Sequence, residues 1–150
     1  MPQRNVGNGP LHRTGYTLIE LAVVVAILSV VTLAGIRRLQ WYLDGIAVRT
    51  AVREIGALVA RARDEAMARR AVVSLHIDTA TSSISLRPRG GPTQLHPVGR
   101  TYGVALSTTR DSIVFDVRGL GYGAANLTLV ARRGAASDTL VVSRLGRVRE

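Results

Sequence analysis

The sequence contains no cysteine, which excludes disulfides, thiolate zinc sites and cysteine nucleophiles. Lysine is also absent, and aromatic residues make up only 4% of the chain, which argues against a surface that stacks nucleic-acid bases. The three histidines, His12, His76 and His96, are too far apart in sequence to form a local metal-binding motif. We therefore expect no metal site and no cofactor.

Arginine supplies all 20 basic residues, and the 10 acidic residues leave a net charge of +10. The use of arginine in place of lysine is typical of GC-rich genomes and carries little functional information. The excess of positive charge, however, favours contact with anions such as phosphates, lipid headgroups or acidic partners. An apolar content of 47% in 150 residues excludes a long disordered chain and indicates one domain.

A polar segment, residues 1–15, precedes an abrupt apolar run. Residues 16–36 carry one charge, Glu20, and the run ends at Arg37 and Arg38. As a helix these residues would extend about 31 Å at ~1.5 Å per residue, which matches a bilayer core of about 30 Å. The run is too long for a strand, because strands rarely exceed about ten residues. It predicts a transmembrane helix.

The helical pattern continues over residues 37–71, which contain no proline. Apolar residues recur at spacings of three and four, which predicts an amphipathic continuation of the same helix. The predicted apolar stripe consists of Leu39, Tyr42, Leu43, Ile46, Val52, Ile55, Leu58, Val59, Ala62 and Ala66.

The pattern changes to alternation over residues 72–150. Alternating apolar residues and turn signals predict several short antiparallel strands, with residues 88–97 as a loop rich in glycine and proline. The predicted strands are residues 72–77, 84–87, 104–107, 113–117, 126–131, 139–143 and 147–149. The fold class is therefore α+β, with the amphipathic half of a long N-terminal helix covering an antiparallel sheet or small sandwich.

The apolar run has three interpretations. A cleavable secretory signal has a shorter apolar region and a small-residue cleavage site, to which residues 32–34 are only a weak match. An ordinary single-pass anchor fits the length, but it leaves Glu20 unexplained. An intramembrane carboxylate costs about 2.5–3.5 kcal/mol on insertion scales, which makes Glu20 a candidate functional residue.

The third interpretation is a resemblance. The segment Gly15-Tyr16-Thr17-Leu18-Ile19-Glu20-Leu21 resembles the processing site of type IV pilins and type II secretion pseudopilins. The resemblance implies that a prepilin peptidase cuts after Gly15 and that Tyr16 becomes the N-methylated first residue. The family usually has phenylalanine at the position of Tyr16, and tyrosine is a mild departure from it.

Glu20 then has an expected role in filament assembly. At helical spacing, Tyr16 and Glu20 lie on one face, and the new amine of Tyr16 would lie near the same depth. The amine of a neighbouring subunit could pair with Glu20 and fix the register of a filament. The alternative is that Glu20 sits in the headgroup region, neutralised by lipid or by protonation.

The later sequence resembles the GspH/FimT branch of minor pseudopilins, from residues 60–70 through the strands at 113–115 and 140–143 to residues 146–149. This resemblance implies a pilin-like fold, partners among other pilins or pseudopilins, and a structural subunit of a periplasmic pseudopilus that serves type II secretion. We expect no enzymatic activity, because no spacing of Ser, His and Asp forms a catalytic set.

The FimT branch also implies an alternative, a minor type IV pilin that binds DNA for uptake. Its basic C-terminal motif is matched by Gly146-Arg147-Val148-Arg149. The candidate DNA-binding residues are Arg132, Arg133, Arg144, Arg147 and Arg149.

Family membership implies a single-pass protein of the bacterial inner membrane, with the leader in the cytoplasm and the β-domain in the periplasm. The arginine count points the other way. The leader carries Arg4 and Arg13, whereas four arginines follow the apolar run within about 20 residues, the range over which the positive-inside bias acts. We give the cleavage motif more weight, because it is the more specific signal.

Overall fold

The computed structural model of the chain describes residues 16–122, 126–143 and 146–149. The chain divides into two compact units, Met1–Arg37 and Arg38–Glu150. The long helix α1 (Leu18–Arg69) begins in the first unit and ends in the second. The predicted helix over residues 16–71 is therefore confirmed, with each end displaced inward by two residues.

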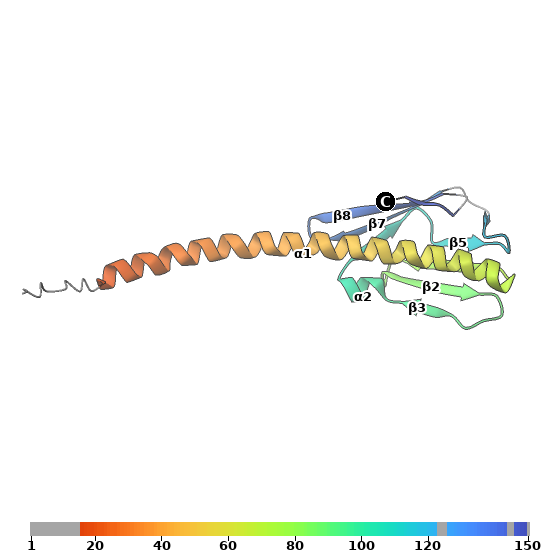
Figure 1. Ribbon diagram of the computed structural model, residues 1–150, viewed down its shortest axis with the longest axis horizontal. Helices are drawn as coiled ribbons and strands as arrows, with labels where there is room; N and C mark the ends of the chain where they lie inside the picture. Colours follow the sequence, from red (N-terminus) through yellow and green to blue (C-terminus); the bar gives the residue numbers. More distant parts are fainter. Residues whose placement is uncertain (1–15, 123–125, 144–145, 150) are drawn as a thin grey trace, which may run out of the picture. The chain divides into compact units, whose positions relative to one another are not determined.

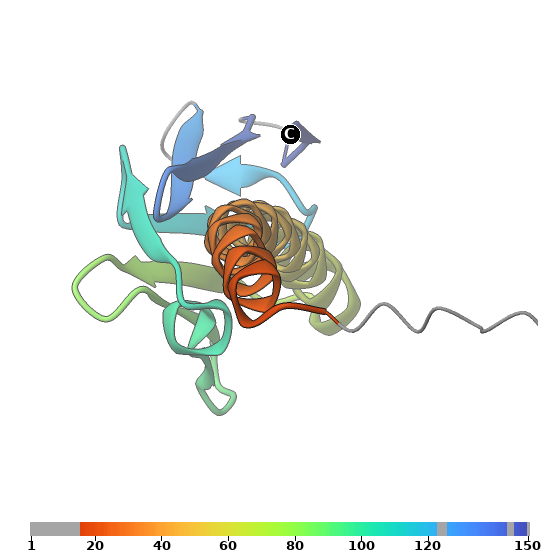
Figure 2. The ribbon, with the colours of Figure 1, turned by 90° about the vertical axis from the view of Figure 1, so that its left-hand side faces the viewer.

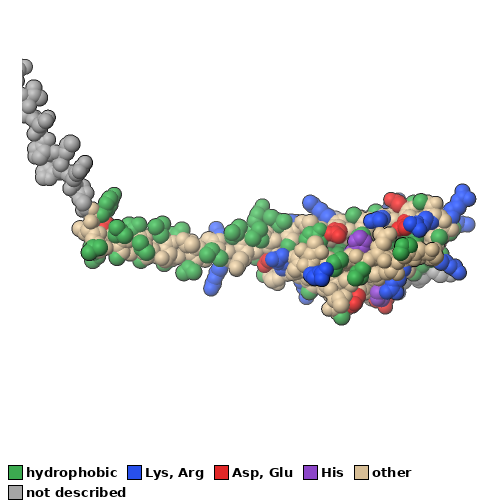
Figure 3. Space-filling model, turned by 90° about the horizontal axis from the view of Figure 1, so that it is seen from below, with side chains coloured by type: hydrophobic (Ala, Val, Ile, Leu, Met, Phe, Trp, Pro, Cys, Tyr) green, Lys and Arg blue, Asp and Glu red, His purple; other side chains and the backbone are tan. Residues whose placement is uncertain are grey.

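The described residues of the first unit include the N-terminal part of α1. The side chain of Thr17 begins the helix, since its Oγ1 accepts a hydrogen bond of 3.3 Å from the backbone N–H of Glu20. Every described residue up to Arg37 is exposed, and apolar side chains cover this part of the helix (Figure 3). The helix contains a stretch with a mean hydropathy of 2.5, long and apolar enough to cross a membrane.

The described residues of the second unit form the rest of α1, a short helix α2 (Val98–Tyr102) and nine strands in two antiparallel sheets. One sheet has the order β3-β2-β1-β5-β6 and the other has the order β4-β7-β8-β9. The strands are β1 (Val73–Asp78), β2 (Ser83–Pro88), β3 (Gln94–His96), β4 (Ala105–Thr108), β5 (Ser112–Phe115), β6 (Gly121–Tyr122), β7 (Leu127–Arg133), β8 (Ala136–Val142) and β9 (Val148–Arg149). Together the two sheets form a curved layer beside α1, with β2 and β3 at one end and β7 and β8 at the other (Figures 1 and 2).

The core lies between α1 and this layer. The buried side chains of α1 begin at Val48 and recur at helical spacing up to Ala66. They meet the inward-facing residues of the strands, among them Leu75, Phe115 and Leu129, each of which is fully buried. Among the described residues, the buried core residues all fall between Val48 and Val142, within the second unit.

The predicted apolar stripe packs against the sheets only in its later part. Its first four residues, Leu39, Tyr42, Leu43 and Ile46, are exposed. Near the point where burial begins, an ion pair of 2.8 Å joins Asp44 of α1 to Arg133, next to the β7–β8 turn. The preceding residues have helical spacing of apolar side chains, but they lie beyond the ion pair and outside the buried core.

Ser82 joins the two sheets. It lies in the turn between β1 and β2 with a left-handed φ of 50°. Its hydroxyl accepts a hydrogen bond of 3.1 Å from the N–H of Leu106 in β4, and its carbonyl accepts one of 2.7 Å from the N–H of Gly99 in α2. One residue therefore links the first sheet, the short helix and the edge of the second sheet.

The prediction of a loop over residues 88–97 is wrong in part. The last residues of this segment form β3, and α2 follows directly. Helix α2 is held at its C-terminal end by a hydrogen bond of 2.6 Å, which the carbonyl of Tyr102 accepts from Arg133 Nη1. The nearby carboxylate of Glu54 raises the pKa of Tyr102. The other differences are small: β8 begins at Ala136 rather than at residue 139, and β6 forms within the glycine-rich segment.

Candidate functional site

The first candidate site is the start of α1. Gly15 lies outside the described residues, and Tyr16 is 83% exposed and precedes the helix. The helical spacing that we predicted between Tyr16 and Glu20 therefore does not apply. Instead, Thr17 and Glu20 occupy the first and last positions of a T-x-x-E pattern, which is typical of helix starts. The carboxylate of Glu20 lies in the first helical turn, where the positive end of the helix dipole stabilises a negative charge.

The second candidate site is a groove of about 920 Å³ between α1 and β9. Among the described residues that line it, four are arginines and none is acidic: Arg53, Gly56, Ala57, Ala60, Arg63, Gly146, Arg147, Val148 and Arg149. We name these residues the arginine groove. Arg147 and Arg149 are exposed and Val148 between them is half-buried, as expected for alternation along a strand.

Gly146 allows β9 to approach α1. It is buried with a φ of 71°, and a Cβ there would lie 3.0 Å from Phe115 Cε1 and 3.5 Å from Arg63 Cδ. The turn that leads into β9 is closed by two hydrogen bonds, Gly146 N–H to the Ser143 carbonyl at 2.9 Å and Ser143 N–H to the Arg147 carbonyl at 2.8 Å. A side chain at Gly146 would push this turn away from the helix and open the groove.

The side chain of Arg63 on α1 packs against the turn that leads into β9. A Cβ at Gly119 would lie 3.1 Å from Arg63 Cγ, so the stem of Arg63 runs against both Gly119 and Gly146. Its Nε is buried and has no hydrogen-bond partner among the described residues. Arg63 therefore lines the groove with its stem packed against the two glycines.

Two of the other predicted arginines, Arg132 and Arg133, lie away from the arginine groove. Arg132 in β7 pairs with Ser137 of β8, whereas β9 pairs with Val141 and Val142 of β8. At about 3.3 Å per residue, this separates Arg132 from β9 by roughly 13 Å along the sheet. Arg133 is held by Asp44 and the Tyr102 carbonyl. Arg144 lies outside the described residues.

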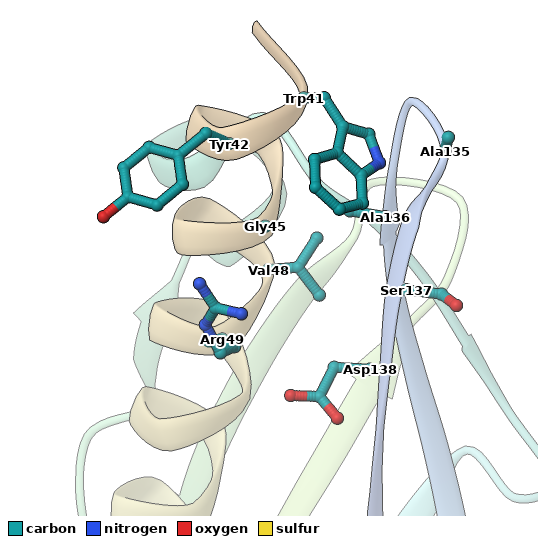
Figure 4. Close-up of a pocket in the computed structure, with 9 residues that line it drawn as sticks. All are labelled: Trp41, Tyr42, Gly45, Val48, Arg49, Ala135, Ala136, Ser137 and Asp138. Atoms are coloured by element: carbon teal, nitrogen blue, oxygen red, sulfur yellow. The ribbon is translucent and has the colours of Figure 1, made fainter. Parts of the chain in front are cut away.

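A second hollow, of about 650 Å³, lies between residues 41–49 of α1 and the β7–β8 hairpin (Figure 4). The carboxylate of Asp138 faces α1, the hydroxyl of Ser137 points away from it, and the guanidinium of Arg49 lies over Gly45. Trp41 at its rim is 67% exposed. Because this hollow carries one acid and one base, it lacks the single sign of charge that distinguishes the arginine groove.

Comparisons with known proteins give two family matches. Residues 51–146 match the family model described as type II transport protein GspH. Residues 11–36 match the prokaryotic N-terminal methylation motif, and this range includes the predicted cleavage site and the whole apolar run. A search of curated proteins finds no match.

Two solved structures are similar in fold, both of the type IV minor pilin FimU from Pseudomonas aeruginosa. In the crystal form of space group P21, the match has a TM-score of 0.57 at 18% identity and covers 68% of this chain and 86% of FimU. In the form of space group P65, the TM-score is 0.56 at 17% identity, with 67% of this chain and 90% of FimU covered. The arrangement of a long helix packed on antiparallel sheets is therefore the arrangement of a minor pilin.

Proposed function

The chain belongs to the GspH family of type II transport proteins, and from this premise we propose that it is a minor pseudopilin, a structural subunit of a periplasmic filament that serves type II protein secretion. The observation that carries the proposal is the N-terminal methylation motif directly before an exposed apolar helix. A prepilin peptidase would cut after Gly15 and methylate Tyr16. The apolar helix would hold the subunit in the inner membrane, with residues 38–150 in the periplasm, until it joins other pilins or pseudopilins.

Glu20 would set the register of assembly. After cleavage, the chain would present a charged amine at Tyr16 and a carboxylate at Glu20 in an apolar setting, where a carboxylate needs a partner. The amine of a neighbouring subunit would supply it. Glu20 also occupies the last position of the T-x-x-E pattern, so a test must separate pairing between subunits from stabilisation of the start of the helix.

We predict that Glu20→Ala inserts into the membrane normally but enters the filament on the order of tenfold less often. The reason is that the charged amine of the neighbouring subunit would lose its carboxylate partner in a poorly solvated setting. The measurement is the amount of protein co-purified with the partner pseudopilins, relative to the amount in the membrane. Two controls separate the roles. Glu20→Gln keeps a side chain suited to the T-x-x-E pattern but removes the charge, and Thr17→Ala removes the cap but keeps the carboxylate.

If the charge matters, Glu20→Gln fails to assemble and Thr17→Ala assembles. The opposite pattern, in which Glu20→Gln assembles like the wild type and Thr17→Ala does not, would show that Glu20 acts on its own helix and would refute the pairing between subunits.

A second candidate function is DNA binding by a minor type IV pilin, and one specific observation favours it. Arg147 and Arg149 line a groove whose described lining contains no acidic residue. Two residues apart on a strand, their side chains project from one face about 7 Å apart, and each guanidinium is suited to a phosphate. Arg132 and Arg133 lie near this motif in sequence but away from the groove, and Arg144 lies outside the described residues.

We predict that the fragment 38–150 binds duplex DNA weakly and without sequence preference at low salt. Because phosphate contacts release counterions, Arg147→Gln combined with Arg149→Gln should lower the slope of log affinity against log salt by about two units. A titration at several salt concentrations measures this slope. A wild-type fragment that does not bind at low salt would eliminate the DNA-binding function and leave the secretion subunit as the single candidate.

A further inference from the structure

We propose that α1 supplies half of the arginine groove as a phosphate-binding surface, so that Arg53 and Arg63 bind the same polyanion backbone as Arg147 and Arg149. This inference rests on the DNA-binding function proposed above. In this inference the phosphate-binding residues come from both α1 and β9, and not from the basic C-terminal strand alone. Neither helix arginine belongs to the motif that the sequence displays.

The distribution of charge on α1 supports a groove on one flank. Arg53 is exposed and forms no ion pair among the described residues, and Arg63 borders the same hollow from the next turns of the helix. Asp64 and Glu65 instead border a different hollow, beside Gln94 of β3, where Glu65 pairs with Arg69 at 2.9 Å. The two hollows adjoin at Ala57 and Ala60, and the acidic pair lines the neighbouring hollow rather than the arginine groove itself.

The floor of the groove is made of small residues. Gly56, Ala57 and Ala60 line it on the helix, and Val148 is its half-buried residue on the strand. These residues leave room for a ligand between the arginines and offer it no hydrogen bonds from side chains. The described residues that line the groove include no aromatic side chain, so they provide no platform on which a base could stack.

A phosphodiester backbone fits this chemistry. Arg53 and Arg63 are ten residues apart, which corresponds to about 15 Å along the helix at ~1.5 Å per residue. This is the axial length of about four phosphates of one strand of B-DNA, at ~3.4 Å each. Planar guanidinium groups on both walls would contact phosphate oxygens, and such contacts position a protein on DNA without reading its sequence.

The first test uses matched charge removals in the fragment 38–150, which contains all the described core residues. Arg53→Gln and Arg61→Gln each remove one exposed arginine from α1, but only Arg53 borders the groove. We expect Arg53→Gln to weaken duplex binding on the order of fivefold near 0.1 M salt and to lower the salt slope by about one unit. Arg61→Gln should leave the slope unchanged, and thermal melts should show both variants to be folded.

The second test fills the groove without changing the charge. Ala60 and Ala68 are both exposed on α1, but only Ala60 borders the arginine groove. We expect Ala60→Leu to weaken DNA binding at least as much as Arg53→Gln does, and Ala68→Leu to bind like the wild type. Equal binding by these two leucine variants would overturn the groove.

The outcomes separate this inference from the function on which it rests. If the wild-type fragment binds vesicles of phosphatidylglycerol but not DNA, the DNA-binding function fails and the inference fails with it. If the wild type binds DNA and the Arg147→Gln, Arg149→Gln variant is weakened, while Arg53→Gln and Arg61→Gln have equal effects, DNA binding stands and the contribution of α1 is refuted.

Discussion

Replacing Gly15 by valine is expected to leave the precursor uncut, so that the protein isolated from membranes keeps its leader. The wild-type chain should begin at N-methyl-Tyr16. The Gly-aromatic junction lies within the methylation motif that matches residues 11–36. Glycine adopts backbone conformations closed to other residues and offers no side chain to a protease, whereas valine is branched at Cβ and restricts both. Mass spectrometry of the N-terminal peptide measures the result directly.

Gly9→Val is the matched control, because it makes the same substitution in the leader away from the junction. It should be processed like the wild type. A wild-type chain that begins at Gly35 would contradict the prediction, since it would indicate cleavage by an ordinary signal peptidase after residues 32–34.

Replacing Gly99 by alanine is expected to have the largest effect on folding. A Cβ there would overlap Ser82 Cβ and would lie 3.0 Å from two backbone oxygens, those of Ser82 and Val104. Ser82 is the residue that links β4 to the turn between β1 and β2, so it cannot move without breaking the link between the sheets. We expect a loss of about 3 kcal/mol of unfolding free energy and a melting temperature lower by more than about 10 °C in the fragment 38–150.

Gly45→Ala provides the matched control. Its Cβ would have no neighbour closer than 3.7 Å, the guanidinium of Arg49, and alanine is favoured over glycine within a helix by up to about 1 kcal/mol. This variant should melt at or slightly above the temperature of the wild type. A Gly99→Ala fragment that melts within two or three degrees of the wild type would show that α2 can shift away from Ser82.

The long helix and most strands could be predicted from the sequence, because both depend on the spacing of apolar residues within one segment. The spacing of three and four over residues 37–71 predicts α1 up to Arg69, and alternation predicts the central strands β1, β2, β5 and β7. The short elements β3 and α2 could not be predicted. They lie among prolines and glycines and are held by Ser82, Arg133 and the paired strand β2, which are remote in sequence.

The sequence by itself determined what depends on neighbouring residues: the methylation motif at Gly15 and Tyr16, the position of Glu20, the apolar run and the membership of the family. Only the tertiary structure decided which arginines meet. Arg132 and Arg133 are near Arg147 in sequence but belong to the far end of a hairpin, whereas Arg53 and Arg63 come from a helix more than eighty residues earlier. The physical reason is that the groove exists only because Gly146 lets β9 pack close to α1. The distance between such segments is set by packing, which the local pattern of residues does not contain.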